Sequence, residues 1–376
     1  MVTAESLIQE IAQYYEILEP VSESGFSVYP LIGSSSTPII SLKEAQTQGL
    51  SWVQESSVES VEQLDAINKG DVPVLIPYLS QVQGGKQDRT VFEPVIVPTG
   101  HDESNPLSIP AKCIEMSRWH YGGSRGEKTT REFSWGKSRV SSQMAHSISL
   151  HHEQGIVWEN VDAAQMSMGF SSSDAPTSSY REMNETAFET REDLKKMLET
   201  LMEGTQNQDQ VGVVVVYKGR LLGIESYGSS NLWNQFSEEV LRGFIIDMYF
   251  LKSEEEEEED ELSPPDVLLS NLNEELKETG LIAQKASGVG DLYRFRNDSW
   301  EGVFILHDGV PIHLYASKKH VDTIADRRVQ QSRSQRRDFR VTPVSSMMPE
   351  QRIMPTDEIA EEDILEEEDS SQISNH

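Results

Sequence analysis

The sequence predicts an α+β fold, and three features of its hydrophobic pattern support this. Short apolar runs alternating with polar residues fill positions 25–120, as expected for β-strands. Helical periodicity then dominates positions 142–202. A hairpin and a helix follow over 211–250, and short strands return at 292–316. Strands and helices are therefore segregated along the chain, which is typical of α+β proteins.

The N-terminal part is predicted to be mainly β. Apolar residues at helical spacing first predict a helix over 4–18, with Pro20 just beyond its end. Ser41 is a good N-cap for a second, short helix that Gly49 can close. Strands are expected at 26–32, 52–61 and 72–76.

The middle of the chain is predicted to be helical and then to form a hairpin. Helices are expected at 142–150, 154–168 and 179–202, the last as one long amphipathic helix ending at Gly204. Buried strands at 211–217 and 221–225 are joined by a turn at Lys218-Gly219. A further helix is expected over 232–250.

An acidic run separates this part from a smaller C-terminal unit. Residues 254–261 are eight consecutive Asp or Glu, a self-repelling pattern typical of a disordered linker. A helix is expected at 267–279, followed by strands at 292–296, 302–307 and 311–316. Asp308-Gly309 between the last two strands is a strong hairpin turn signal.

This pattern predicts four consecutive parts. They are a main α+β domain over 1–250 (β-rich 25–120, helical 140–203, hairpin and helix 210–250), an acidic linker over 251–265, a small α+β unit over 266–317 that completes the fold, and a disordered charged tail over 318–376. Within that tail, residues 318–340 carry eight Lys or Arg against three Asp, and 358–369 is strongly acidic.

The net charge argues against binding to nucleic acid or to anionic membranes. Lys and Arg total 32 against 63 Asp and Glu, which gives a formal charge of −31. Neutralisation of phosphates by Lys and Arg supplies most non-specific nucleic-acid affinity, so nucleic acid is an unfavourable partner. The N-terminus lacks a basic region followed by an apolar run, and no apolar stretch is long enough to span a membrane. We expect a soluble, cytoplasmic protein.

Metal sites and cofactors are not indicated by the sequence. A single cysteine excludes an intramolecular disulfide framework and a multi-cysteine zinc site, and Cys113 is expected to be buried and inert. His151 and His152 are adjacent, so on a helix they point in directions about 100° apart and do not share a metal easily. No resident cofactor is predicted.

The polar loop after residue 84 is the first candidate site. Lys86, Gln87 and Arg89 follow paired glycines between two apolar runs, so they are expected at the ends of neighbouring strands. Arg binds carboxylate or phosphate in a bidentate manner and Lys adds a point charge, which favours an anion-binding loop for a nucleotide phosphate. The alternative is a structural turn in which Arg89 pairs with Asp88 or Glu93. Neither the P-loop spacing nor the dinucleotide-binding pattern is present.

A second polar cluster lies at the end of the apolar run 109–114. Glu115 and Arg118 are three residues apart across a predicted strand-to-loop transition, and Trp119 follows directly. One of the two charged side chains can orient the other or bind a substrate. Glu225, in the predicted hairpin, is one of several acidic residues whose spacing alone carries little information in so acidic a chain.

Several motifs in a fixed order resemble one prokaryotic family of unknown function. The motifs are Gly84-Gly85-Lys86-Gln87-Asp88-Arg89, Val97-Pro98, Ile109-Pro110 with Cys113, Glu115, Arg118 and Trp119, Gln154-Gly155 with Val157-Trp158, Gly219-Arg220 with Gly223, Glu225 and Tyr227-Gly228, and Leu241-Arg242-Gly243-Phe244 with Asp247. They resemble the ADP-ribosylglycohydrolase- and rhodanese-phosphatase-associated protein family, from about residue 25 to residue 316.

The resemblance implies a link to NAD and ADP-ribose metabolism rather than a known reaction. The positions that match the family's polar motif are Lys86, Gln87, Arg89, Glu115, Arg118, Trp119 and Glu225. Members often carry an acidic residue just before the glycine pair, where this chain has Ser80-Gln81-Val82-Gln83. If that acid is a catalytic base in the family, this chain lacks it.

Two functional hypotheses follow. In the first, the protein binds, or binds and processes, an ADP-ribose- or NAD-type nucleotide: Arg89 and Arg118 hold phosphate, Trp119 stacks on a base or ribose, and Glu115 is the acid–base candidate. In the alternative, the chain is a non-catalytic module that docks a partner enzyme of nucleotide metabolism through its surface and its charged tail.

Overall fold

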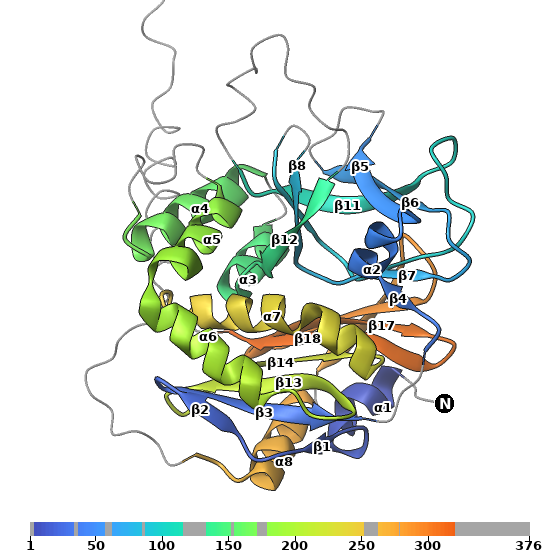
Figure 1. The fold of residues 1–376 in the computed structure, drawn as a ribbon. Helices are drawn as coiled ribbons and strands as arrows, with labels where there is room; N and C mark the ends of the chain where they lie inside the picture. Colours follow the sequence, from blue (N-terminus) through green and yellow to red (C-terminus); the bar gives the residue numbers. More distant parts are fainter. Residues whose placement is uncertain are drawn as a thin grey trace, which may run out of the picture. The chain divides into compact units, whose positions relative to one another are not determined.

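The computed structural model describes residues 4–33, 37–56, 62–84, 87–115, 133–151, 154–170, 179–251, 262–277 and 279–319. These residues form an α+β fold, as the sequence predicts (Figure 1). The linker residues 252–261 and the tail residues 320–376 lie outside the described part, and so does the tail surface on which the partner-docking hypothesis depends. None of the described helices is long and apolar enough to cross a membrane.

The largest sheet joins segments from three distant parts of the chain. It has nine strands in the order β1-β3-β13-β14-β18-β17-β16-β15, with β2 paired to β3, and all its pairs are antiparallel. The strands are β1 Glu16–Ile17, β2 Val21–Glu23, β3 Phe26–Ile32, β13 Gln210–Tyr217, β14 Arg220–Tyr227, β15 Gly280–Lys285, β16 Asp291–Arg296, β17 Trp300–His307 and β18 Val310–Lys318. The C-terminal strands thus extend the sheet that the central hairpin begins.

Two smaller sheets are built from the N-terminal part. The six-stranded sheet has the order β12-β8-β9-β11-β6-β5, and its outer strands β12 and β5 contact each other, so the sheet curls. Its strands are β5 Ser51–Glu55, β6 Gln63–Asn68, β8 Ser80–Gly84, β9 Arg89–Val91, β11 Leu107–Cys113 and β12 Phe133–Arg139. The three-stranded sheet contains β4 Ile40–Ser41, β7 Val74–Ile76 and β10 Val95–Val97, and β4 pairs with β7 in parallel.

Both faces of the large sheet are buried under helices. Alternation along β13 sends Val213 and Val215 into one apolar core, and Val214 and Val216 into another on the opposite face. The first core lies against α7 and the helices before it, and the second lies against α1 and α8 (Figure 1). The helices are α1 Ala4–Gln9, α2 Leu42–Thr47, α3 Ser142–His151, α4 Gln154–Ser167, α5 Tyr180–Thr190, α6 Glu192–Gly204, α7 Ser230–Asp247 and α8 Pro265–Leu276.

The predicted helix cap at Ser41 and the two predicted hairpin turns are confirmed. The side chain of Ser41 accepts a 3.0 Å hydrogen bond from the Glu44 N–H and caps α2. Lys218 and Gly219 have φ values of 47° and 71°, and Asp308 and Gly309 have values of 52° and 72°. Two successive residues with positive φ form the tight turn that matches the twist of a hairpin.

Two predictions about elements are wrong. The N-terminal helix ends at Gln9, because the chain then makes a short 3₁₀ turn and enters β1, which pairs with β3. The helix expected over 179–202 is two helices, α5 and α6, because Arg191 between them is extended at φ −100° and ψ 109°. Edge strand β15 was not predicted.

Tertiary contacts explain the break at Arg191. Its guanidinium donates hydrogen bonds to the Met168 carbonyl and, at 2.7 Å, to the Tyr249 hydroxyl. The same group lies over the rings of Phe170 and Tyr249, with its carbon 5.5 Å and 5.1 Å from the ring centroids. These partners lie far from Arg191 in the sequence, so a periodicity that runs through it cannot show the break.

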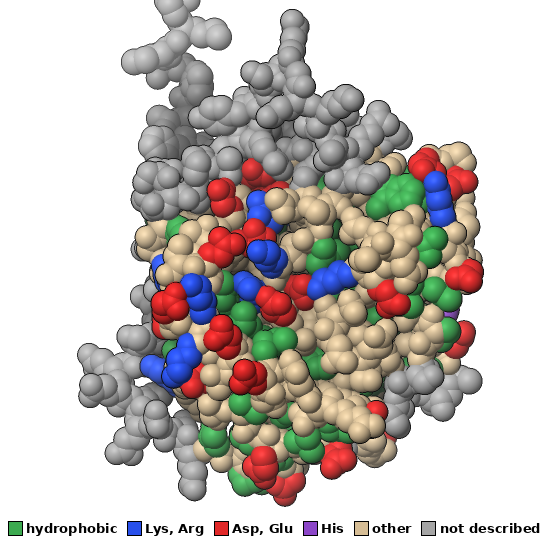
Figure 2. Space-filling view, viewed as in Figure 1, with side chains coloured by type: hydrophobic (Ala, Val, Ile, Leu, Met, Phe, Trp, Pro, Cys, Tyr) green, Lys and Arg blue, Asp and Glu red, His purple; other side chains and the backbone are tan. Residues whose placement is uncertain are grey.

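On the face shown in Figure 2, the described Lys and Arg side chains lie among Asp and Glu side chains and form no continuous basic patch.

A buried ion pair joins α2 to α7 and predicts a pH dependence. The Lys43 ammonium contacts the carboxylate of Glu239 and donates to the Gln235 carbonyl. Burial raises the pKa of Glu239 from its ordinary value of 4.5 to about 7, with Lys43 opposing the shift. A raised pKa means that the folded state binds more protons than the unfolded state in this window, so stability falls as pH rises from 4.5 through 7.

We therefore expect the free energy of unfolding of a Glu239→Gln variant to lose part of this downward slope between pH 4.5 and 7. Urea denaturation across that range measures it. Glu238→Gln is the matched control, because the side chain of Glu238 is 49% exposed and pairs with Arg242 at the surface. An unchanged slope in Glu239→Gln would contradict the assignment.

Candidate functional site

Three of the residues predicted from sequence converge where β9 begins and β11 ends. Arg89 stands opposite Cys113 in the β9–β11 register. The side-chain amide of Gln87 donates a 2.8 Å hydrogen bond to the Glu115 carbonyl, and the Asp88 N–H donates a 2.9 Å bond to Glu115 Oε2. We call Gln87, Asp88, Arg89 and Glu115 the Arg89 cluster. All four are buried, and Gln87 and Arg89 are fully so.

Helix α5 is attached to this cluster through Asp88. Asp88 Oδ2 accepts hydrogen bonds from Ser179 Oγ at 3.1 Å and from Arg181 Nε at 2.8 Å. Glu115 also forms an isolated β-bridge with Ser179. The cluster therefore lies at a junction of the curled sheet and the helical region, where its carboxylates fix the local backbone.

Arg89 does not pair with either of the acids that the structural-turn interpretation named. Asp88 pairs with Arg181, and Glu93 accepts a 2.9 Å hydrogen bond from the Ser287 N–H. Arg89 lies instead near Glu55, with Nη2 3.6 Å from Glu55 Oε2. That distance is an ion pair but too long for a strong hydrogen bond.

The guanidinium of Arg89 has more donors than acceptors around it. Nη1 donates a long bond of 3.5 Å to Gln87 Oε1, whereas Nε and Nη2 have no hydrogen-bond acceptor among the described residues. A buried charge is normally both paired and hydrogen-bonded, because an unmade bond to such a group costs about 1–3 kcal/mol or more. This donor set suits an oxyanion such as phosphate.

Cys113 confirms its predicted character. It is a free, fully buried thiol that donates to the Glu115 carbonyl at 3.0 Å. Burial raises its pKa, although the charge of Arg89 opposes the shift. The thiol is therefore protonated and unreactive at neutral pH.

The other members of the predicted site lie outside the described residues; they are Lys86, Arg118 and Trp119.

Glu225 belongs to a different cluster. Its Oε2 lies 2.8 Å from Arg139 Nε, and its Oε1 accepts a 2.8 Å bond from the Tyr227 hydroxyl. No ion pair or hydrogen bond within the described residues joins it to the Arg89 cluster. Strand β8 lies between the two arginines, since its Val82 pairs with Arg89 of β9 and its Ser80 pairs with Arg139 of β12.

Arg139 was missed by sequence reasoning and is central to this second cluster. It is buried, donates a 2.8 Å bond from Nη1 to the Val140 carbonyl, and places its guanidinium carbon 4.3 Å from the Phe244 ring centroid. The one sequence feature that pointed to Arg139 was Gly243 of α7, which packs against the Arg139 side chain. A Cβ there would lie 2.7 Å from Arg139 Cγ, so this helix position accepts only glycine without rearrangement. Nε and Nη2 of Arg139 lack a hydrogen-bond partner among the residues that the structure describes, as those of Arg89 do, but the ion pair of Arg139 is shorter, at 2.8 Å against 3.6 Å, which favours a structural role.

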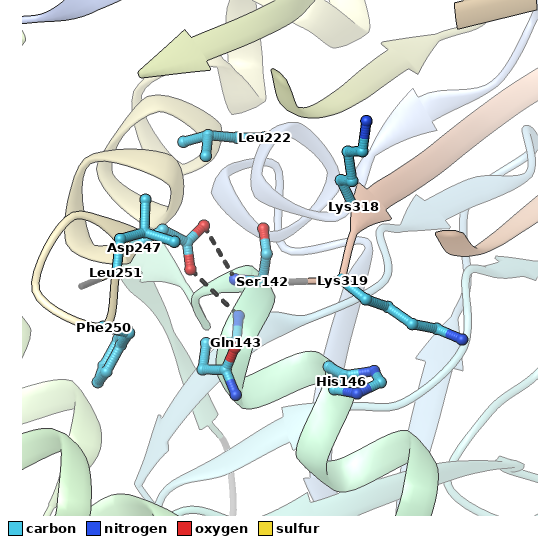
Figure 3. Close-up of a pocket in the computed structure, with 9 residues that line it drawn as sticks. All are labelled: Ser142, Gln143, His146, Leu222, Asp247, Phe250, Leu251, Lys318 and Lys319. Atoms are coloured by element: carbon cyan, nitrogen blue, oxygen red, sulfur yellow. Dashed lines mark hydrogen bonds between the residues drawn. The ribbon is translucent and has the colours of Figure 1, made fainter. Parts of the chain in front are cut away.

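Asp247 lies close enough to Arg139 for their charges to interact. Its two oxygens accept hydrogen bonds from the Ser142 N–H at 3.2 Å and the Gln143 N–H at 3.1 Å, so it caps α3 (Figure 3). Burial raises the pKa of Asp247 to about 6, opposed by Arg139. Because the carboxylate already occupies this helix N-terminus, the backbone donors there are not open to another anion.

The cations in the pocket of Figure 3 also have partners. Lys318 Nζ lies 2.8 Å from Glu275 Oε2, and Lys319 donates to the Asn297 carbonyl. His146 Nδ1 lies 2.9 Å from Glu301 Oε2. Each of these cations therefore already faces an oxygen atom of the protein. Among the described residues, no group of three or more His, Cys, Asp or Glu side chains is arranged to hold a metal ion.

The chain thus folds into an α+β domain. In this domain the curled six-stranded sheet and the helical region meet at the buried Arg89, whose guanidinium has unsatisfied donors. The family model of the ARG and Rhodanese-Phosphatase-superfamily-associated Protein domain matches residues 14–317. The chain belongs to this family, in agreement with the resemblance of its motifs. The match includes both clusters and excludes the charged tail. No curated protein matches the chain, and no solved structure does.

Proposed function

We propose that this protein binds an ADP-ribose- or NAD-type nucleotide, and that Arg89 contacts a phosphate of that ligand. The observation that carries the proposal is the fully buried Arg89 guanidinium, whose Nε and Nη2 have no acceptor among the described residues. The family's association with ADP-ribosylglycohydrolases supports the ligand class. Phosphate supplies the acceptors that this donor set needs.

The proposal also gives roles to the other predicted residues. Gln87 orients the Arg89 guanidinium from one side, and Glu115 holds the turn by accepting the Asp88 N–H. Lys86 and Arg118 add positive charge beside the phosphate, and Trp119 stacks on the base or ribose in this proposal. Glu115 is the acid–base candidate if the bound nucleotide is also processed.

Burial of Arg89 has a kinetic consequence. A ligand reaches a fully buried guanidinium only after a local opening, so association should be slower than a diffusion-controlled encounter. The bound phosphate then replaces a loose 3.6 Å ion pair with short, charge-assisted hydrogen bonds.

Arg89→Gln is expected to weaken ADP-ribose binding at least about tenfold, since a charge-assisted hydrogen bond contributes roughly 1.5–3 kcal/mol. Arg89→Lys should lose most of the same affinity, because an ammonium keeps the charge but not the planar fork. Isothermal titration calorimetry of the full chain measures both. Arg220→Gln, on the turn end of β14, is the charge-matched control.

Folding of the variants must be separated from binding. Arg89→Gln removes the ion pair between Arg89 and Glu55, so the double variant Arg89→Gln/Glu55→Gln removes both charges together. Circular dichroism and thermal melting without ligand confirm that each variant is folded. Wild-type affinity in a folded Arg89→Gln protein would refute the proposed contact.

A further inference from the structure

An open groove lies on the large sheet beside edge strand β15, and one of its lining residues, Tyr315, also contacts Arg139. Its volume is about 230 Å³, smaller than the roughly 300–1,000 Å³ typical of small-molecule sites. The side chains that matter here are those of Tyr78, Ile282, Arg294, Arg296, Glu301 and Tyr315. We call this the Arg294 groove.

Strand register places its two arginines on one face of the sheet. Arg294 pairs with Ile282 of β15, and Arg296 pairs with Glu301 of β17. Because Arg294 and Arg296 are two residues apart on β16, their side chains leave the same face about 6.7 Å from each other. In a chain with a formal charge of −31, two neighbouring arginines in one groove form a locally favourable place for an anion.

Arg294 is held in position before any ligand arrives. Its Nη2 donates a 2.6 Å bond to the Phe92 carbonyl, and its Nε donates a 3.0 Å bond to Gln284 Oε1. Its guanidinium carbon lies 4.9 Å from the Phe92 ring centroid and 5.5 Å from that of Tyr78. A guanidinium fixed by packing loses little conformational entropy when it binds an anion.

Arg296 and Glu301 supply the other polar part of the groove. Arg296 Nη2 lies 2.9 Å from Glu301 Oε2, and His146 Nδ1 lies 2.9 Å from the same oxygen. The Arg296 side chain is 39% exposed, so its guanidinium faces the groove and solvent as well as Glu301. Ile282 at the mouth is 59% exposed and offers apolar surface.

We propose that the Arg294 groove binds a small molecule carrying a diphosphate, with Arg294 and Arg296 each contacting one phosphate and Ile282 contacting the rest of the ligand. Two arginines about 6.7 Å apart on one strand can grip two linked phosphates from either end. In this proposal the Glu301 carboxylate accepts a hydrogen bond from a hydroxyl group of the ligand. This inference is independent of the Arg89 proposal.

The test uses inorganic pyrophosphate as probe and the full chain. Hydrogen exchange of the β15–β16 amides, measured by mass spectrometry at constant ionic strength, reports binding at this groove and not at Arg89. We expect millimolar pyrophosphate to slow exchange over 280–296 in the wild type. Arg296→Gln should need about tenfold more pyrophosphate for the same protection, since one charge-assisted contact is lost.

Lys277→Gln is the matched control, because Lys277 is a surface cation on the helix side of β15 that pairs only loosely, at 3.5 Å, with Glu274. It should leave the protection unchanged. Exchange over β13 without ligand checks that Arg296→Gln is folded. Absence of protection in the wild type, equal protection in Arg296→Gln, or equal loss in Lys277→Gln would overturn the proposal. Greater protection by citrate than by pyrophosphate would also overturn it, in favour of a carboxylate ligand.

Discussion

Glu225→Ala is expected to destabilise the folded protein by about 3–5 kcal/mol, the usual cost of removing one partner from a buried ion pair. Glu225 is fully buried and lies 2.8 Å from Arg139, which is itself 2% exposed. Without the carboxylate, the Arg139 charge stays in an apolar layer between β14 and α7, and Tyr227 loses the acceptor of its hydroxyl. Urea denaturation at neutral pH measures the effect.

Two further variants identify the cause. Arg139→Met/Glu225→Leu removes both charges and should recover most of the loss, because apolar replacement of a whole buried pair is often neutral or stabilising. Tyr227→Phe removes only the hydroxyl that donates to Glu225 at 2.8 Å, and should cost roughly 1.5–3 kcal/mol. A Glu225→Ala loss below 1 kcal/mol would show that Arg139 finds another partner or water.

Trp300→Ala should cost about 3–5 kcal/mol and loosen the attachment of α8. Trp300 is fully buried in the core beneath the large sheet, and its Nε1 donates a 2.7 Å bond to Glu275 of α8. Removing the indole creates a cavity and breaks the side-chain link from β17 to this helix. Urea denaturation gives the energy, and hydrogen exchange over 265–276 should accelerate more than exchange over α7.

Trp300→Phe separates packing from hydrogen bonding. It keeps an aromatic ring in the core but leaves the Glu275 carboxylate with its remaining partner, Lys318, at 2.8 Å. Its cost should be clearly smaller than that of Trp300→Ala. Equal costs for the two variants would mean that the bond to Glu275, rather than the filled volume, attaches α8 to the sheet.

The parts of the fold that sequence predicts are those decided within a few residues. The turns at Lys218-Gly219 and Asp308-Gly309 need positive φ, and the presence of glycine and aspartate there indicates such turns in the sequence. The cap at Ser41 and the alternation in β3 and β13 are equally local. The pairing of β3 with β13 and of β14 with β18 depends on which distant strand buries the same face, and alternation alone does not specify the partner.

In the candidate site, too, the residues close to predicted strand ends could be predicted from the sequence, whereas those that depend on distant contacts could not. Gln87, Arg89 and Glu115 were expected at neighbouring strand ends, and the β9–β11 pairing does bring them together. Their role in binding a ligand stays a prediction. Arg139 escaped notice because its partners Glu225, Phe244 and Tyr315 come from three other elements. Strand β15 has mostly exposed side chains at the sheet edge and thus lacks the hydrophobic pattern that marks a strand.

The most direct test of the central claim is a calorimetric titration of ADP-ribose into the wild-type chain, repeated with sulfate at the same ionic strength. A saturable binding isotherm for ADP-ribose that persists in the presence of sulfate is the predicted result, because the nucleotide gains contacts beyond those of a lone anion. The account would be contradicted by no binding of ADP-ribose at millimolar concentration, or by full competition from equimolar sulfate.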